Sequence, residues 1–146
     1  MSALDAVTRG RAAFDRNAWS EAYRELTLAD RQNSLTAEDL DRLATAAYLV
    51  GYESTAADAR ARAHAAFLEH GDLPRAARSA FWLGYALISV PAQQAQGNGW
   101  LARAKRLLDE CGEERVEYGL LLCTQGYMKI VEGDFTSALA LFEQAD

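Results

Sequence analysis

The apolar positions of the chain repeat one short pattern of small and bulky residues four times. An alanine is followed four positions later by leucine, phenylalanine or alanine, and three positions after that by another small residue. Steps of four and three residues place all three side chains on one face of an α-helix. The four copies are Ala22-Leu26-Ala29, Ala59-Ala63-Ala66, Ala104-Leu108-Cys111 and Ala138-Phe142-Ala145. Their first alanines lie 37, 45 and 34 residues apart, a spacing typical of helical repeats that bury their faces against each other.

Apolar periodicity and capping signals predict eight helices. Thr36, Asp72 and Asp134 stand where helix N-caps are expected, and glycines follow several of the predicted helices. The helices are expected at residues 3–15, 19–32, 37–51, 53–70, 73–90, 100–110, 114–132 and 135–146. Residues 91–99, which include Pro91, Gly97 and Gly99, are expected to form the longest loop.

Short turns between helices favour antiparallel pairs. The sequence therefore predicts an all-α fold, a right-handed α-solenoid of four antiparallel hairpins in a single domain. The hairpins are expected at about residues 3–34, 36–71, 73–112 and 114–146.

Composition agrees with helix and narrows the classes of function. Half of the 146 residues are hydrophobic, and only two are proline. The net charge of −6 makes direct contact with nucleic acid a poor expectation, because phosphate binding needs clustered Lys and Arg. No apolar stretch approaches the roughly 20 residues that span a bilayer, and the first residues do not resemble a secretory signal. We expect a cytoplasmic location and no membrane partner.

The residues offer no pattern typical of catalysis, metal binding or a cofactor. His64 and His70 are six positions apart and would face different directions, so both are expected on the surface. Cys111 and Cys123 are expected to be buried and unreactive. No phosphate-binding glycine loop and no nucleophile motif is present. The sequence therefore predicts a protein that is not an enzyme. A small cavity that encloses Tyr48, Tyr85 and Tyr127 together with a buried carboxylate would reopen that question.

The fourth predicted pair resembles a tetratricopeptide repeat (TPR). The matching residues in the fourth pair are Gly126, Gly133-Asp134-Phe135, Ala138, Phe142 and Ala145. In the first pair the same positions are filled by Gly10, Trp19, Ala22, Leu26 and Ala29. The third pair has Leu83-Gly84, and the second pair is the most degenerate. The resemblance covers nearly the whole chain and departs from the family at residues 91–99 and in the missing closing prolines.

Three further stretches look like the N-terminal repeat region of actinobacterial LuxR-type transcriptional regulators. They are residues 46–51 (AAYLVG), 81–85 (FWLGY) and 99–110 (GWLARAKRLLDE). In that family a repeat array precedes a C-terminal helix-turn-helix domain that binds DNA. The resemblance implies that this chain is the sensory or interaction part of a longer protein.

The TPR resemblance implies a concave groove lined by the first helix of each pair. Tyr48, Tyr85 and Tyr127 fall at the same position of three repeats and would form a column of aromatic rings. The candidate groove residues are Arg11, Phe14, Tyr48, Tyr52, Arg78, Phe81, Tyr85, Ile88, Tyr127 and Ile130. Such a groove would suit a peptide or a small ligand. The alternative is that the tyrosines only wedge between adjacent helices and that Arg11 and Arg78 are solvated or paired locally.

The last predicted helix carries a second candidate surface. Leu139, Leu141 and Phe142 lie in it with no further helix to cover them, whereas solenoids usually end in a polar capping helix. We expect this face to contact another copy of the chain or another part of the same polypeptide.

These expectations point to a binding module for a protein, a peptide or a small-molecule signal. The interpretation that the resemblance favours is the interaction or sensory part of a LuxR-type regulator. The alternative is a stand-alone peptide-binding adaptor or scaffold that has no role in transcription.

Overall fold

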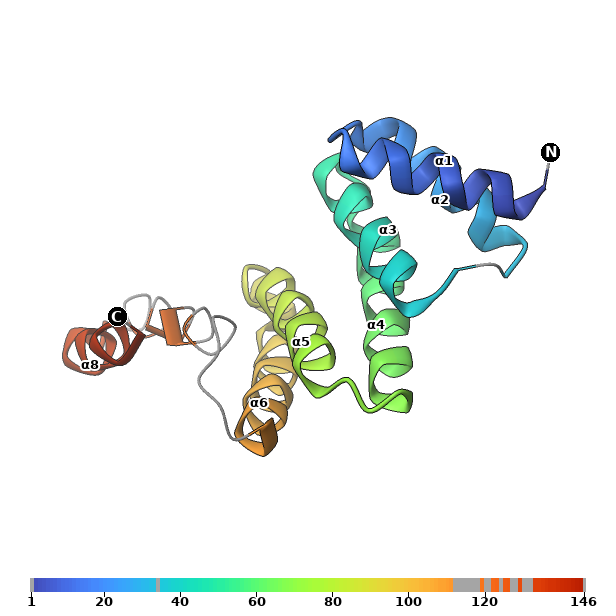
Figure 1. The fold of residues 1–146 in the computed structure, drawn as a ribbon. Helices are drawn as coiled ribbons and strands as arrows, with labels where there is room; N and C mark the ends of the chain where they lie inside the picture. The colour runs from blue at the N-terminus through green and yellow to red at the C-terminus, as the bar shows by residue number, and fades with distance from the viewer. Residues whose placement is uncertain are drawn as a thin grey trace. The chain divides into compact units, whose positions relative to one another are not determined.

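The computed structural model describes residues 2–33, 35–111, 119, 122, 123, 125, 126, 129 and 133–145. Over these residues the chain forms seven α-helices and one 3-10 helix, with no β-strand, which confirms the all-α fold class (Figure 1). The α-helices are α1 (Ala3–Asp15), α2 (Trp19–Arg31), α3 (Ala37–Leu49), α4 (Glu53–Glu69), α5 (Leu73–Ile88), α6 (Gln94–Cys111) and α8 (Phe135–Ala145), and the 3-10 helix η1 covers Pro91–Gln93.

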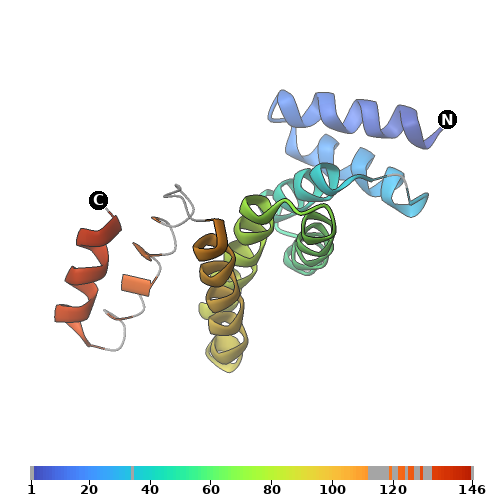
Figure 2. The same ribbon diagram turned by 60° about the horizontal axis from the view of Figure 1, so that its bottom comes forward.

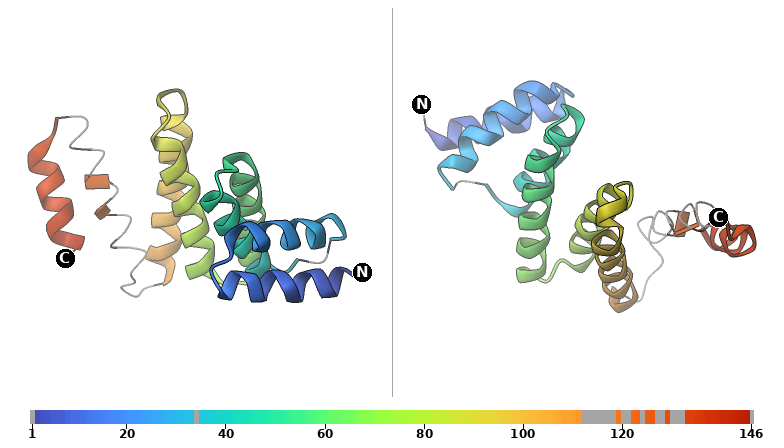
Figure 3. Two further views of the ribbon diagram at one scale, coloured as in Figure 1. Left: turned by 90° about the horizontal axis from the view of Figure 1, so that it is seen from above. Right: turned by 180° about the vertical axis from the view of Figure 1, so that it is seen from behind.

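The chain divides into two compact units, Met1–His70 (unit 1) and Gly71–Asp146 (unit 2). In unit 1, α1 lies beside α2 and α3 beside α4, and α2 also packs on α3 (Figure 2). In unit 2, α5 lies beside α6 (Figure 3). Every helix in the described part of the chain falls short of the length and apolar character needed to cross a bilayer.

The two hairpins of unit 1 are closed by the same kind of turn. Asn17 and Gly51 adopt left-handed backbone angles, with φ of 61° and 93°. The next residue in each turn, Ala18 or Tyr52, donates its amide N–H to the carbonyl oxygen five residues earlier, at 2.9 and 2.8 Å. This pattern is the Schellman motif, which satisfies carbonyl groups left open at a helix end. The two left-handed residues are 34 positions apart in the sequence, at 17 and 51.

Small residues bring the helices of unit 1 close together. Ala22, Leu26 and Ala29 have no exposed surface, so the first copy of the apolar pattern faces the core as predicted. A Cβ atom on Gly10 of α1 would lie 2.7 Å from the Leu26 side chain, closer than atoms of neighbouring residues approach. Glycine at position 10 therefore sets the distance between α1 and α2.

The start of α3 follows the prediction for its N-cap. The Thr36 hydroxyl accepts a hydrogen bond from the Asp39 amide at 3.2 Å and donates one to the Asp39 carboxylate at 3.0 Å. The reciprocal arrangement is a capping box, which satisfies two amide groups that a helix leaves open.

The predicted loop at residues 91–99 is wrong. η1 turns the chain over Pro91–Gln93, and α6 already begins at Gln94 rather than at Trp100. The Gln94 side-chain amide donates to the Ile88 carbonyl oxygen at 3.4 Å, which ties the first turn of α6 to the end of α5.

The physical reason for this error is the role of Gly97. A Cβ atom there would lie 2.9 Å from the backbone nitrogen of Ile88 and 3.0 Å from the carbonyl oxygen of Gly84. The glycine is buried inside α6 and lets the two backbones approach, whereas the sequence suggested that it breaks the helix. Gly99, on the exposed side of the same helix, has open space around it.

The predicted helix at 114–132 lies mostly outside the described residues, and those described within it are helical. Gly126 packs against α8, since a Cβ atom there would lie 2.7 Å from the Phe142 ring. Asp134 caps α8 as predicted, because its carboxylate accepts the Ser137 amide at 3.1 Å. Its pKa is lowered by that hydrogen bond.

Candidate functional site

Arg11 does not present a free guanidinium to a groove. It reaches from α1 to α3 and binds Asp39 with both ends of its fork: Nε donates to Oδ1 at 2.8 Å and Nη2 to Oδ2 at 2.7 Å. Arg42 adds a third charged hydrogen bond to Oδ1 at 2.9 Å. Arg11 thus forms an ion pair inside unit 1, with a residue 28 positions away in the sequence.

Asp39 is the most buried charged side chain in the described residues, with none of its surface exposed. Burial alone would raise the pKa of its carboxyl, but hydrogen bonds from Arg11 and Thr36 outweigh burial and hold that pKa below its usual value. The hydrogen bonds to Asp39 also raise the pKa of Arg11. The carboxylate is thus ionised and hydrogen-bonded to Arg11, Arg42 and Thr36, and it connects the first two hairpins.

Similar pairs link the other helices of unit 1. Arg9 binds Glu25 at 3.0 Å and joins α1 to α2, and Arg62 binds the carboxylate of Asp30 at 2.7 and 2.8 Å and joins α4 to α2. A further pair between Arg60 and Asp41 joins α4 to α3. Because alanine cores offer little shape to fix helix positions, these directional pairs contribute to the geometry of the unit.

The aromatic candidates of unit 1 lie near the two hairpin turns. Phe14 is half-buried and contacts Trp19 edge-to-face, with ring centroids 5.2 Å apart. Tyr48 and Tyr52 are 50% and 54% exposed. Tyr52 stacks on Tyr23, with centroids 4.8 Å apart and an angle of 17° between the rings.

In unit 2 the candidates separate into core and surface. Phe81 and Ile88 are buried against α6, in a cluster with Leu101, which corrects their assignment to a groove wall. They fail as groove residues because the close approach at Gly97 turns that face of α5 toward α6. Arg78 is half-buried.

Tyr85 is 41% exposed and lies against a tryptophan that is itself exposed. Trp82 is 37% exposed, and its ring lies edge-to-face with Tyr85 at 5.7 Å between centroids. Trp19 is half-buried, and Trp100 packs on the α5–α6 core beneath the guanidinium of Arg103.

The predicted column of tyrosines stays a prediction. Tyr127 and Ile130 lie outside the described residues, and Tyr48 and Tyr85 belong to different units.

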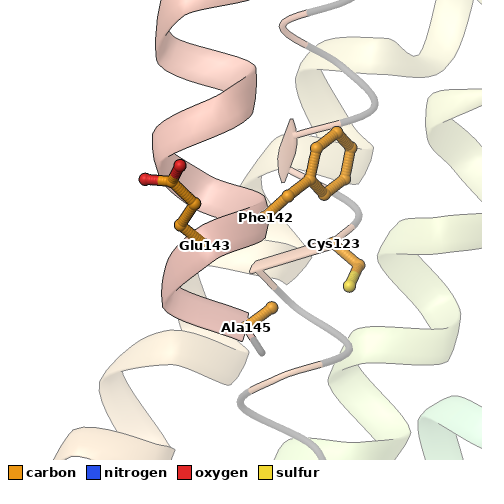
Figure 4. Close-up of a pocket in the computed structure, with 4 residues that line it drawn as sticks. All are labelled: Cys123, Phe142, Glu143 and Ala145. Carbon is orange, nitrogen blue, oxygen red and sulfur yellow. The ribbon is translucent and has the colours of Figure 1, made fainter.

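The candidate face of α8 is apolar in part. Leu139 is 60% exposed, whereas Leu141 and Phe142 are half-buried. A shallow hollow of about 370 Å³ beside α8 is lined by Cys123, Phe142, Glu143 and Ala145. In Figure 4 the Phe142 ring faces the segment that carries Cys123, while the Glu143 carboxylate points away from it. Among the described lining residues, the Cys123 thiol therefore has no carboxylate or other base directed at it.

Two predictions about polar side chains are wrong. His64 is buried inside α4's packed face, whereas His70 is exposed and approaches the Ala66 carbonyl oxygen at 2.7 Å. Cys123 is exposed and Cys111 is half-buried, and both thiols are free. A single sequence does not distinguish a buried from an exposed histidine on a helix rich in alanine. In the described part of the chain, no three His, Cys, Asp or Glu side chains gather in a way that could hold a metal ion.

Sequence reasoning missed the Asp39 network and the exposure of Leu49 and Trp82. The Thr36-x-x-Asp39 spacing signals a capping box, but the partner Arg11 is 28 residues away and no local pattern indicates it. Comparison of the chain with protein-family models and with curated proteins gave no match.

Proposed function

We propose that this chain is a binding module built as a TPR-type array of four helical hairpins. The observation that carries the proposal is the recurrence of the same hairpin features along the chain: the turn recurs within unit 1, and the glycine contact occurs once in each unit. Left-handed Schellman turns recur after 34 residues, and a glycine in a first helix packs on a bulky residue of the next helix. That glycine pairing has the same 16-residue separation in Gly10–Leu26 and Gly126–Phe142. Repeat arrays of this kind work mainly as binding surfaces.

The exposed aromatic side chains support binding over catalysis. Tyr48 and Tyr52 in unit 1, and Trp82 and Tyr85 in unit 2, keep a large part of their rings in solvent. Tyrosine and tryptophan supply contact area together with a polar tip, a combination enriched at interfaces. The buried carboxylate of Asp39 is occupied by arginines, so it offers no general base to a substrate.

A thermal-shift screen of the whole chain against peptides and small molecules tests this proposal. We expect at least one compound to raise the melting temperature of the wild type and to lose its effect in a Tyr48→Ala/Tyr85→Ala variant. Leu28→Ala is the matched control, since Leu28 is similarly exposed but lies on a second helix of a hairpin. Compounds that stabilise the control and the double variant equally would contradict the assignment of these tyrosines.

Within this proposal, the chain serves as the sensory or interaction part of a LuxR-type regulator. The partner would then be a small-molecule signal, a protein, or another domain of the same polypeptide. The proposal also includes contact between the apolar face of α8 and a second copy of the chain. A ligand would regulate such a protein only if it binds two conformations with different affinity. A helix-turn-helix encoded downstream in the same reading frame is expected; a stop codon directly after position 146 would overturn this part and leave the binding role standing.

A further inference from the structure

The α3–α4 turn carries three large side chains that the fold leaves in solvent. Tyr48 and Leu49 end α3, and Tyr52 follows after Gly51; their exposed fractions are 50%, 50% and 54%. The amide of Tyr52 donates to the Ala47 carbonyl oxygen at 2.8 Å, so the chain folds back and holds Tyr52 beside the last turn of α3. Within the described residues, the Tyr48 ring and hydroxyl have no aromatic or hydrogen-bonding partner.

The α1–α2 hairpin brings a further aromatic ring to the same end of unit 1. Tyr23 of α2 stacks on Tyr52, and Ala13, Ala22 and Ala46 form one buried cluster beneath it. The α1–α2 and α3–α4 turns accordingly lie at one end of the unit (Figure 1). We call Tyr23, Tyr48, Leu49 and Tyr52 the turn patch.

Acidic side chains flank the turn patch. Asp15 ends α1 and Glu53 begins α4 directly after Tyr52; both are exposed, and no described residue forms an ion pair with either. Arg16, the basic residue of the α1–α2 turn, is held by Glu21 at 2.7 Å. The two free carboxylates therefore favour a cationic partner, and the faces of exposed tyrosine rings attract ammonium and guanidinium groups as well.

The size of the turn patch limits its partner. The side chains of Tyr48, Leu49 and Tyr52 are each about half exposed. Together they present on the order of 300 Å² of surface, which is the size of functional patches on monomers. A stable dimer interface needs roughly 800 Å² from each partner. A short segment therefore fits better than a second copy of the chain.

We propose that the turn patch binds a short peptide segment in which lysine or arginine lies next to an apolar side chain. The apolar residue packs against Tyr48 and Leu49, and the cation lies over a tyrosine ring within reach of Glu53 or Asp15. This inference rests on the proposed binding function and adds to it the surface and the chemistry of the partner.

A selection from a random 12-residue peptide display library against the whole chain tests the inference. The enriched peptide is then synthesised, and its dissociation constant is measured by calorimetry. We expect enrichment of Lys or Arg next to Leu or Phe. Tyr48→Ala/Tyr52→Ala should weaken binding at least tenfold, Glu53→Gln/Asp15→Asn should weaken it several-fold and reduce its salt dependence, and Tyr48→Phe/Tyr52→Phe should retain it.

Leu28→Ala is the matched control, because Leu28 is 40% exposed on α2 of the same unit but lies outside the turn patch; it should bind as the wild type does. Circular dichroism establishes that each variant is folded. Enriched peptides that are acidic, or whose affinity depends on Leu28 and not on Tyr48, would overturn this inference and leave the proposed binding function standing. A selection that enriches no peptide at all would overturn the inference, while the small-molecule screen above would still decide the binding function.

Discussion

Replacing Arg11 with alanine is expected to lower the free energy of unfolding of unit 1 by about 2–3 kcal/mol. The substitution removes two charged hydrogen bonds, at 2.8 and 2.7 Å, from a carboxylate that has no exposed surface. Breaking a buried ion pair from one side typically costs about 3–5 kcal/mol, because one charge stays buried without compensation. Here the cost is smaller, since 45% of the Arg11 side chain is exposed, water can enter, and Arg42 remains bound.

Arg16→Ala is the matched control on the same hairpin. Its pair with Glu21 has a similar distance, 2.7 Å, but the two side chains are 58% and 41% exposed. Exposed pairs contribute about 0–1 kcal/mol, so this variant should remain within about 1 kcal/mol of the wild type. Both variants lose one positive charge, so the difference between their free energies of unfolding reports the burial of the Asp39 carboxylate.

Urea unfolding followed by tryptophan fluorescence measures both variants. The chain has three tryptophans, and a Trp82→Phe/Trp100→Phe background leaves Trp19 as the reporter of unit 1. A double-mutant cycle with Asp39→Ala should give a coupling energy of about 2 kcal/mol between Arg11 and Asp39. Equal free energies of unfolding for Arg11→Ala and Arg16→Ala would refute the reasoning, because the pair would then contribute no more than a surface pair.

Three further outcomes are expected. Gly97→Ala should destabilise unit 2 by about 1–3 kcal/mol in thermal or urea unfolding, because its Cβ atom would meet backbone atoms of α5. Gly99→Ala, in open space on the same helix, should be neutral or stabilising by about 0.5–1 kcal/mol. A loss below about 1 kcal/mol for Gly97→Ala would contradict the close approach of α5 and α6. The pKa of Asp39 is lower in the folded than in the unfolded state. Its contribution to the free energy of unfolding is therefore present above about pH 4 and is lost as the pH falls through the folded-state pKa. Urea unfolding should show a steeper loss of stability in acid for the wild type than for Asp39→Asn, and parallel pH profiles of the two proteins would contradict this expectation. Cys123 should react with a thiol reagent such as DTNB faster than Cys111, since it is more exposed. The reverse order in single-cysteine variants would contradict this difference in exposure.

The sequence predicted the helices well where signals were local. The N-caps at Thr36 and Asp134 and the buried face of the first apolar copy depend on neighbours within one or two turns, and the structure confirms all three. These signals are local because the hydrogen bonds of a cap span three residues.

The errors come from contacts between helices. Gly97 has the local features of a loop residue, yet it is buried against α5 within α6. Arg11 has the features of a solvated residue, yet it binds Asp39, 28 residues away. Phe81 and Ile88 have the spacing of groove residues, but their burial depends on how closely α6 approaches. Such contacts depend on the register between helices, which the pattern of one helix does not determine.

The measurement that tests the central claim most directly is the NMR response of the tyrosine rings of the whole chain to a bound peptide. With ¹³C-labelled tyrosine, the chain gives six ring environments, and single Tyr→Phe variants assign them. Titration with the peptide enriched by display should shift the signals of Tyr23, Tyr48 and Tyr52, saturating with one dissociation constant that matches calorimetry. Binding that saturates by calorimetry while these three signals stay unchanged would contradict the account.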